Sequence, residues 1–187
     1  MSRLRPAFIL SALLAPASAL ATVVLSMSME EMTARAPLVV HATVNATGPG
    51  WDAEHAKIWT WTELVVKDTL KGKAQPTVLV KQPGGVVGDL GMHVDGVATF
   101  APGEEVVLFL EPAPDEPGSW VPVAMSSSKV TFEARPGAKL ARRDLAGLVF
   151  ARPGQKGVVQ PVDEREQLGT ADAFLARIRA AVKKGAR

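Results

Sequence analysis

The chain has 187 residues, 47% of them hydrophobic, and a formal net charge of +2. A chain of this length and apolar content normally forms one domain with a substantial core, and its 16 Gly and 14 Pro are too few for a disordered protein. It contains no cysteine, which excludes disulfides, thiolate nucleophiles, iron–sulfur clusters and a lipid anchor carried on cysteine.

The N-terminal segment has the pattern of a secretory signal peptide. Arg3 and Arg5 give a positive start, an apolar run follows, and the Ala-Leu-Ala sequence at 19–21 supplies small residues for cleavage. The alternative, an uncleaved anchor helix, is disfavoured because Pro16 interrupts the apolar stretch. We therefore expect residues 1–21 to be a cleaved signal peptide. The rest is expected to be exported, to the periplasm or the extracellular space, without a membrane span.

The remaining chain is predicted to consist mainly of short β-strands, with one helix near each end. Ser28 and Glu31 have the spacing of a capping box, which predicts a short helix over residues 28–33. Thr170 is expected to cap a final helix that runs to about Lys184. Apolar runs and period-two alternation predict strands at 38–44, 57–67, 77–81, 94–100, 105–110, 120–124, 129–133, 148–150 and 158–162.

The expected connections between these strands point to an antiparallel fold. Residues 47–50 and 83–85 are rich in Gly and Pro and are predicted to be turns. The strands at 120–124 and 129–133 are expected to form a hairpin or meander, and 148–150 to pair with a strand at 158–162. A parallel α/β fold would need helical crossovers between strands, and the pattern contains none. The expected fold class is mainly β, a small antiparallel barrel or sandwich.

Charge is divided unevenly along the chain. Residues 22–134 hold 7 Lys and Arg against 14 Asp and Glu, whereas residues 135–187 hold 12 against 5. One interpretation is a basic tail that binds anionic polymers. We favour another, because the basic residues are spaced out. Residues 22–134 form the β-domain, and residues 135–187 form a basic C-terminal extension whose hairpin and terminal helix pack onto it.

The order of elements resembles the TIMP/netrin-like branch of the OB-fold over residues 36–110. The resemblance is carried by APLVVHATV at 36–44, LVVKDTLKG at 64–72, VLV at 78–80 and FAPGEEVVLFL at 100–110. Similar patterns occur in exported bacterial proteins of unknown function. The resemblance implies an OB-like β-barrel and a bias towards binding. Family inhibitors of metalloproteases chelate zinc with an N-terminal cysteine, which this chain lacks, so that inhibitory role is not carried over.

Trp59 and Trp61 are the sharpest candidate for a binding site. Their spacing puts both rings on one face of the predicted strand, opposite the apolar face. Such a pair can stack on sugars or bases, as OB-folds do on a strand face. In the alternative interpretation, which we favour slightly, the pair is buried beneath the C-terminal helix against Phe174 and Ile178. If the pair binds a ligand, the Gly-rich loop that carries Asp89, His93 and Asp95 is a possible rim.

Other groups of residues give weaker indications of a metal-binding or catalytic site. The histidines, at 41, 55 and 93, match no metal-binding spacing, so we expect no metal and no cofactor. Ser126 and Lys129 form a Ser-x-x-Lys pattern, but it precedes a strand and lacks its companion motifs. Glu104 and Glu105 are adjacent on a strand and point to opposite faces, which makes them poor partners for acid–base catalysis.

These observations favour an exported, non-enzymatic binding or interaction module. The expected partner is a protein or an envelope polysaccharide, and nucleic acid is not expected. One alternative is a metal-assisted hydrolase that uses the loop residues Asp89, His93 and Asp95. The other is a structural component of an envelope assembly.

Overall fold

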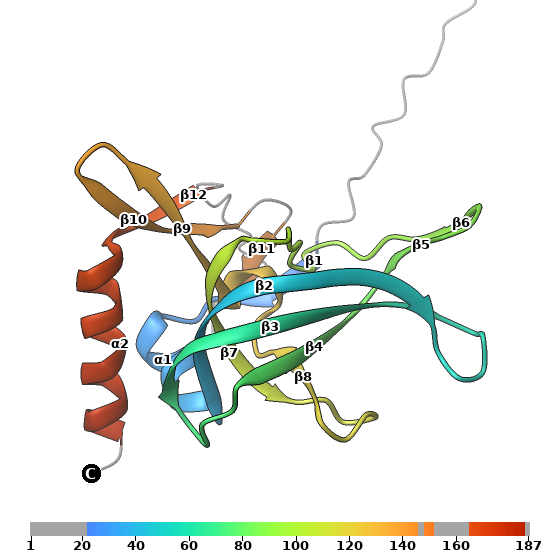
Figure 1. The fold of residues 1–187 in the computed structure, drawn as a ribbon, viewed down its shortest axis with the longest axis horizontal. Helices are drawn as coiled ribbons and strands as arrows, with labels where there is room; N and C mark the ends of the chain where they lie inside the picture. Colours follow the sequence, from blue (N-terminus) through green and yellow to red (C-terminus); the bar gives the residue numbers. More distant parts are fainter. Residues whose placement is uncertain (1–21, 146–147, 152–164, 186–187) are drawn as a thin grey trace, which may run out of the picture.

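The computed structural model describes residues 22–145, 148–151 and 165–185. The signal peptide expected at 1–21 and the strand expected at 158–162 lie outside these residues. The described residues are mainly β, as predicted, with a short α-helix near the start and a longer one at the end (Figure 1). Neither of these two helices has the length and apolar composition needed to cross a membrane.

The helices begin and end close to the predicted positions. Helix α1 (Met29–Arg35) carries the predicted capping box: the Ser28 hydroxyl accepts from the Glu31 backbone, and the Glu31 carboxylate accepts from the Ser28 backbone. Helix α2 (Ala171–Gly185) begins where the Thr170 hydroxyl accepts a hydrogen bond from the backbone N–H of Ala173, at 3.3 Å. The start of each helix therefore follows from a capping side chain that is visible in the sequence.

The strands within the described residues divide into a large sheet and smaller pairs (Figure 1). They are β1 (Thr22–Leu25), β2 (Leu38–Trp51), β3 (Ile58–Lys71), β4 (Thr77–Pro83), β5 (Gly85–Val87), β6 (Leu90–Met92), β7 (Glu105–Pro112), β8 (Ser119–Pro122), β9 (Lys129–Arg135), β10 (Ala138–Asp144), β11 (Leu148–Ala151) and β12 (Arg165–Thr170). A 3₁₀ turn at Met125–Ser128 separates β8 from β9.

The large sheet is mixed, which corrects the expectation of a purely antiparallel fold. Its order is β12-β10-β9-β7-β2-β3-β4-β8. Strand β8 pairs in parallel with β4 and antiparallel with β7, so the pairings from β7 through β2, β3, β4 and β8 return to β7. The expected hairpin of 120–124 with 129–133 is wrong. Strands β8 and β9 instead follow one another along the same edge of β7, at Leu110–Pro112 and Val106–Leu108.

Two further expectations about the chain path are wrong. Residues 47–50 are not a turn but part of β2, paired with Trp59–Thr62 of β3. Strand β2 pairs with β7 only up to Thr43, so Pro49 lies in a stretch with one open edge, where a missing N–H is tolerated. Residues 94–100 are not a strand, and the preceding segment forms the β5–β6 hairpin instead.

Alternate side chains of the central strands enter two separate apolar cores. On β2, Val39 joins a core beneath the helices, whereas Val40 joins a core inside the ring of paired strands. Helix α2 contributes Phe174 and Ile178 to the first core, where they meet side chains from α1 and β7. The period of two along β2 and β7 thus builds two cores from the same strands.

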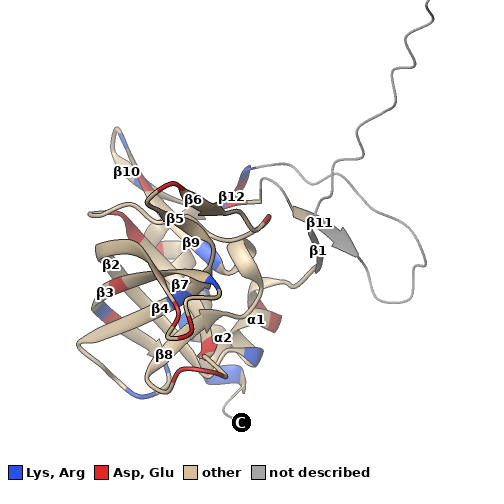
Figure 2. Ribbon diagram, turned by 90° about the vertical axis from the view of Figure 1, so that its right-hand side faces the viewer, with Lys and Arg blue, Asp and Glu red and all other residues tan. Residues whose placement is uncertain are grey.

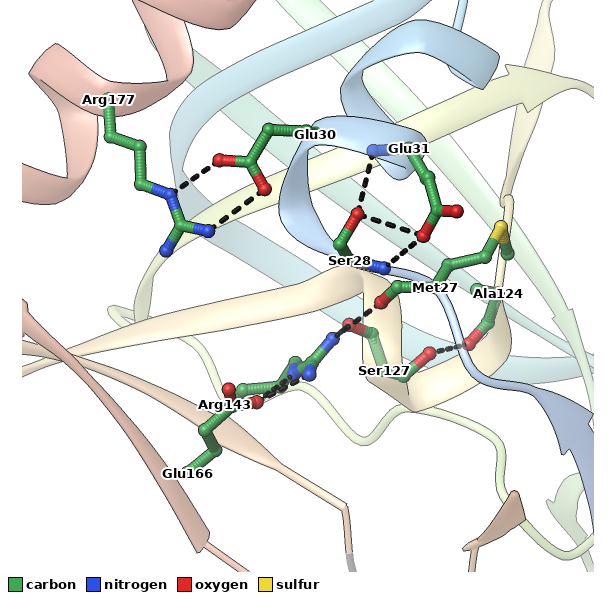
Figure 3. Close-up of polar contacts among 9 residues, drawn as sticks. All are labelled: Met27, Ser28, Glu30, Glu31, Ala124, Ser127, Arg143, Glu166 and Arg177. Carbon is green, nitrogen blue, oxygen red and sulfur yellow. Dashed lines mark hydrogen bonds and ion pairs between the residues drawn. The ribbon is translucent and has the colours of Figure 1, made fainter. Parts of the chain in front are cut away.

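Cations of the C-terminal segment pair with carboxylates of residues 22–134. Arg177 of α2 reaches Glu30 of α1 at 2.7 Å, beside the capping box (Figure 3). Arg179 reaches Asp68 of β3 at 2.7 Å. Further pairs join Lys139 to Glu105 and Arg142 to Glu133. Figure 2 shows Lys and Arg positions in blue near the labels of β10 and α2. These contacts favour the interpretation in which the basic segment lies against acidic strands.

Candidate functional site

The tryptophan pair lies far along β3 from the terminal helix, and the burial interpretation is wrong. Phe174 and Ile178 pack in the core beneath the helices, which contains neither Trp59 nor Trp61. Both tryptophan rings are half-buried, on the face of β3 opposite the buried Ile58. The period-two prediction that the rings share a non-core face is therefore confirmed.

The two rings form the wall of an open hollow of about 500 Å³. The β2–β3 loop bounds it on one side and the β7–β8 loop on another. We call it the tryptophan groove; it is lined by Trp51, Asp52, Ala53, Glu54, Lys57, Trp59, Trp61, Lys81, Asp115 and Glu116. A Cβ added at Gly50 would lie 3.1 Å from the Trp61 ring, so this glycine lets the ring lie close against β2.

A buried lysine holds the groove together. Lys81 of β4 is only 5% exposed, and its ammonium lies 2.9 Å from the Asp115 carboxylate and 3.1 Å from that of Glu116. The same ammonium lies 4.2 Å from the centre of the Trp59 ring, a cation–π distance. Trp61 donates its indole N–H to Glu116 at 3.1 Å. The β7–β8 loop is therefore fastened to β3 and β4 through one ammonium and one indole.

The ionisation of these groups follows from their contacts. Burial acts to lower the pKa of Lys81, but hydrogen bonds to Asp115 and Glu116 outweigh it, and the pKa of the ammonium is raised. The hydrogen bond from Lys81 lowers the pKa of Asp115. Burial acts to raise the pKa of Glu116, but hydrogen bonds from Ser119, Lys81 and Trp61 lower it overall. The cluster therefore stays charged across the neutral range.

The β2–β3 loop forms the other rim of the groove. The Asp52 carboxylate accepts a hydrogen bond from the backbone of Ala56 at 2.7 Å, which closes the loop. Trp51 stacks on His55 with ring centres 6.2 Å apart. Glu54 is exposed at this rim. Carboxylates thus stand on both loops that border the tryptophan rings.

The predicted rim residues Asp89, His93 and Asp95 lie elsewhere. His93 lies 2.9 Å from Asp95, with its side chain 86% exposed, and Asp89 is exposed at the β5–β6 turn. His93 lines a different hollow, with Thr60 and Gly84, that shares no lining residue with the tryptophan groove.

The strand period explains this separation. Adjacent residues of β3 point to opposite faces, so Thr60 points away from Trp59 and Trp61. The Thr60 hydroxyl donates to the carbonyl of Gly84 at 2.7 Å, which fixes the start of the hairpin on that side. The structure therefore does not bring the two halves of the predicted site together.

No metal centre is assembled in the part of the chain that the structure describes. There, no three His, Asp or Glu side chains are grouped so that they could hold an ion. His41 instead lies 2.8 Å from the carboxylate of Glu105. The hydrolase alternative, which needs loop His and Asp residues around a metal, gains no support from these residues.

The known proteins compared with this sequence do not extend the interpretation. No protein-family model matches the chain, and no curated protein matches it. The tryptophan groove remains the feature that points to a function, and its residues Lys81, Asp115 and Glu116 were not predicted from the sequence. One available signal was Lys81 itself, a lysine that directly follows the apolar run Val78–Val80.

Proposed function

We propose that this protein is a non-enzymatic binding module and that the tryptophan groove is its ligand site. The observation that carries the proposal is the gathering of Trp51, Trp59 and Trp61 at one open hollow between two loops. Tryptophan combines a large apolar surface with few rotatable bonds, and it dominates many binding sites for that reason. The rings are half-buried and held by neighbours, Trp61 by its hydrogen bond to Glu116, Trp59 by the Lys81 ammonium and Trp51 by stacking on His55, so they lose little further freedom when a ligand covers them.

An OB-like barrel is the architecture that we infer around this groove. The closed run of pairings from β7 through β2, β3, β4 and β8, with its parallel β4–β8 pair, supports this inference. OB-folds bind ligands on the face of their second and third strands, between the loops that follow the first and fourth. In chain order the strands of the closed run are β2, β3, β4, β7 and β8, so β3 and β4 are the second and third. The tryptophan groove lies on these two strands, between the β2–β3 and β7–β8 loops. The resemblance to the TIMP/netrin-like branch points to the same architecture.

The polar groups of the groove support binding rather than catalysis. Lys81 is engaged by two carboxylates, and Glu116 also accepts from Trp61 and Ser119. These contacts fix the walls and present no activated nucleophile. With the signal peptide expected at 1–21, the proposed setting is the periplasm or the extracellular space.

A titration with defined ligands tests the proposed site. Tryptophan fluorescence is recorded while neutral oligosaccharides, acidic peptides and basic peptides are added to the purified protein. We expect at least one class to bind, and Trp51→Ala to weaken that binding by about tenfold or more, the loss typical of an aromatic anchor. Trp120→Phe is the control, because the partly buried Trp120 ring packs against the core inside the ring of strands and does not line the groove. Binding that a folded Trp51→Ala protein retains in full would place the site elsewhere.

A further inference from the structure

The lining of the tryptophan groove carries more negative than positive charge. Asp52 and Glu54 stand on one loop, and Asp115 and Glu116 on the other. Against them stand the ammonium groups of Lys57 and Lys81. Lys81 is buried in the wall, so among the lining residues only Lys57 offers a cation towards solvent. The surrounding residues 22–134 also have twice as many acidic as basic side chains, 14 against 7.

The walls of the groove already hold one ammonium of the protein's own. The Lys81 ammonium combines an aromatic face, 4.2 Å away, with carboxylate oxygens at 2.9 and 3.1 Å. Burial normally disfavours an ammonium, and here its neighbours reverse that effect. Trp51 and Glu54 present the same two elements, a half-buried aromatic ring and a carboxylate, at the solvent side of the groove.

We propose that the ligand of the tryptophan groove is a basic polypeptide segment that places a Lys or Arg side chain between Trp51 and Trp59. This proposal rests on the proposed function of the groove. The incoming cation lies against the aromatic rings and is attracted by Asp52 and Glu54, as Lys81 is held by Asp115 and Glu116.

An extended polypeptide fits the strand face beyond the groove. Val65 and Leu79 are among the exposed large apolar residues, on the same face of β3 and β4 as Trp61. Leu79 pairs with Glu63, two residues from Val65 on that face, so a strip of two apolar side chains beside the Glu63 carboxylate continues from the tryptophans along the strands. Alternate side chains of a bound segment can lie along this strip.

Two other ligand classes fit the groove less well. Single-stranded nucleic acid requires a basic groove around its aromatic platforms, and this lining is acidic. Sugar hydroxyls are held by hydrogen bonds to groups at fixed positions, and in this lining the oxygens of Asp115 and Glu116 are already engaged by Lys81, Trp61 and Ser119. A cation is attracted by charge alone and needs no vacant lone pair at a fixed position.

Fluorescence titration with three matched probes tests the proposal on the full chain. The probes are a pentapeptide of alternating Lys and Ala, its counterpart with Glu in place of Lys, and the neutral oligosaccharide chitotetraose. We expect the lysine peptide to bind and the other two not to bind. Its affinity is expected to fall about tenfold between about 20 mM and about 500 mM salt, because screening weakens attraction between exposed charges.

Charge-reversal variants test whether the lysine peptide binds at the tryptophan groove. Glu54→Lys is expected to weaken the lysine peptide about tenfold at low salt. Glu111→Lys is the matched control: it reverses a carboxylate that pairs with Arg35 outside the groove, and we expect less than a twofold change. Equal losses in the two variants would mean that the peptide responds only to the overall charge, and would overturn the proposal.

The remaining outcomes separate this proposal from the one on which it rests. If chitotetraose binds, the lysine peptide does not, and Trp51→Ala abolishes the sugar binding, the groove is a ligand site but its ligand is not cationic. Binding of the glutamate peptide alone overturns the proposal in the same way. If no probe changes the fluorescence and none binds by calorimetry, the proposed function of the groove fails as well.

Discussion

Two ion clusters in this protein have opposite charges at their centres. In the tryptophan groove a cation, Lys81, is surrounded by the carboxylates of Asp115 and Glu116. At the start of β7 an anion, Glu105, is surrounded by hydrogen-bond donors: the His41 imidazole at 2.8 Å and the ammonium groups of Lys67 and Lys139 at 2.9 Å each. Each cluster joins segments that lie far apart in the sequence.

The difference between the clusters lies in what they connect. Glu105 joins side chains of β2, β3 and β10, so its contacts tie the C-terminal segment to the central sheet. Lys81 joins a strand to the β7–β8 loop and to two tryptophan rings at an open hollow. The first cluster therefore supports the fold, whereas the second shapes a surface that a ligand can reach.

The largest effect is expected when the cation of the groove is removed. Lys81→Met keeps an unbranched apolar side chain but leaves the Asp115 and Glu116 carboxylates without their counterion. Breaking a buried ion pair on one side costs about 3 to 5 kcal/mol. We expect about 3 kcal/mol of lost unfolding free energy, since both carboxylates retain contact with water.

Urea unfolding measures this loss, with a second lysine as control. Lys73 is exposed in the turn after β3, and Lys73→Met is expected to change the unfolding free energy by less than about 0.5 kcal/mol. Equal stability of the two variants would show that Lys81 is not needed to hold the β7–β8 loop in place.

Acid titration should separate the anionic cluster from the cationic one. Burial acts to raise the pKa of Glu105, but hydrogen bonds from Lys67, Lys139 and His41 outweigh it and lower the pKa from its usual 4.5 to about 2. A carboxyl whose pKa is lower in the folded state stabilises the fold above its unfolded pKa. That contribution is present above about pH 4.5 and is lost as the pH falls towards about 2.

The comparison of wild type with Glu105→Gln isolates this contribution. We expect the variant to be less stable by about 2 kcal/mol at pH 7 and nearly as stable as the wild type near pH 2. Unfolding free energies measured by urea at several pH values give the difference, in which other carboxyls cancel. A constant difference across that range would show that the charge of Glu105 does not stabilise the fold.

Sequence reasoning found what depends on local pattern and missed what depends on strand pairing. The period of two placed Trp59 and Trp61 on a non-core face, and the capping pattern at Ser28 placed helix α1. Lys81 lies beside Trp61 because β3 pairs with β4, and Glu116 reaches both residues because β8 pairs with β4 and β7. That pairing brings together residues 35 positions apart, and no local periodicity encodes it.

The misplaced turn has a similar origin. Gly and Pro at 47–50 favour a turn when the chain is considered locally. In the fold, the open edge of β2 tolerates Pro49, and Gly50 makes room for the ring of Trp61. The actual reversal lies at residues 52–57, where the side chain of Asp52 closes the loop. Pro49 and Gly50, of residue types that usually interrupt strands, thus lie within β2 beside the large aromatic ring of Trp61.

The smallest effect on the unfolding free energy is expected in the Gly-rich loop that carries His93 and Asp95. His93 and Asp95 are two residues apart and lie 2.9 Å from one another, with the His93 side chain almost fully exposed. An exposed pair of this kind contributes little, because water solvates both groups equally well in the unfolded chain. We expect His93→Ala to change the unfolding free energy by less than about 0.5 kcal/mol and to leave peptide binding at the tryptophan groove unchanged. A binding loss as large as that of Trp51→Ala would mean that the hairpin and the groove act on one ligand, although they line separate hollows.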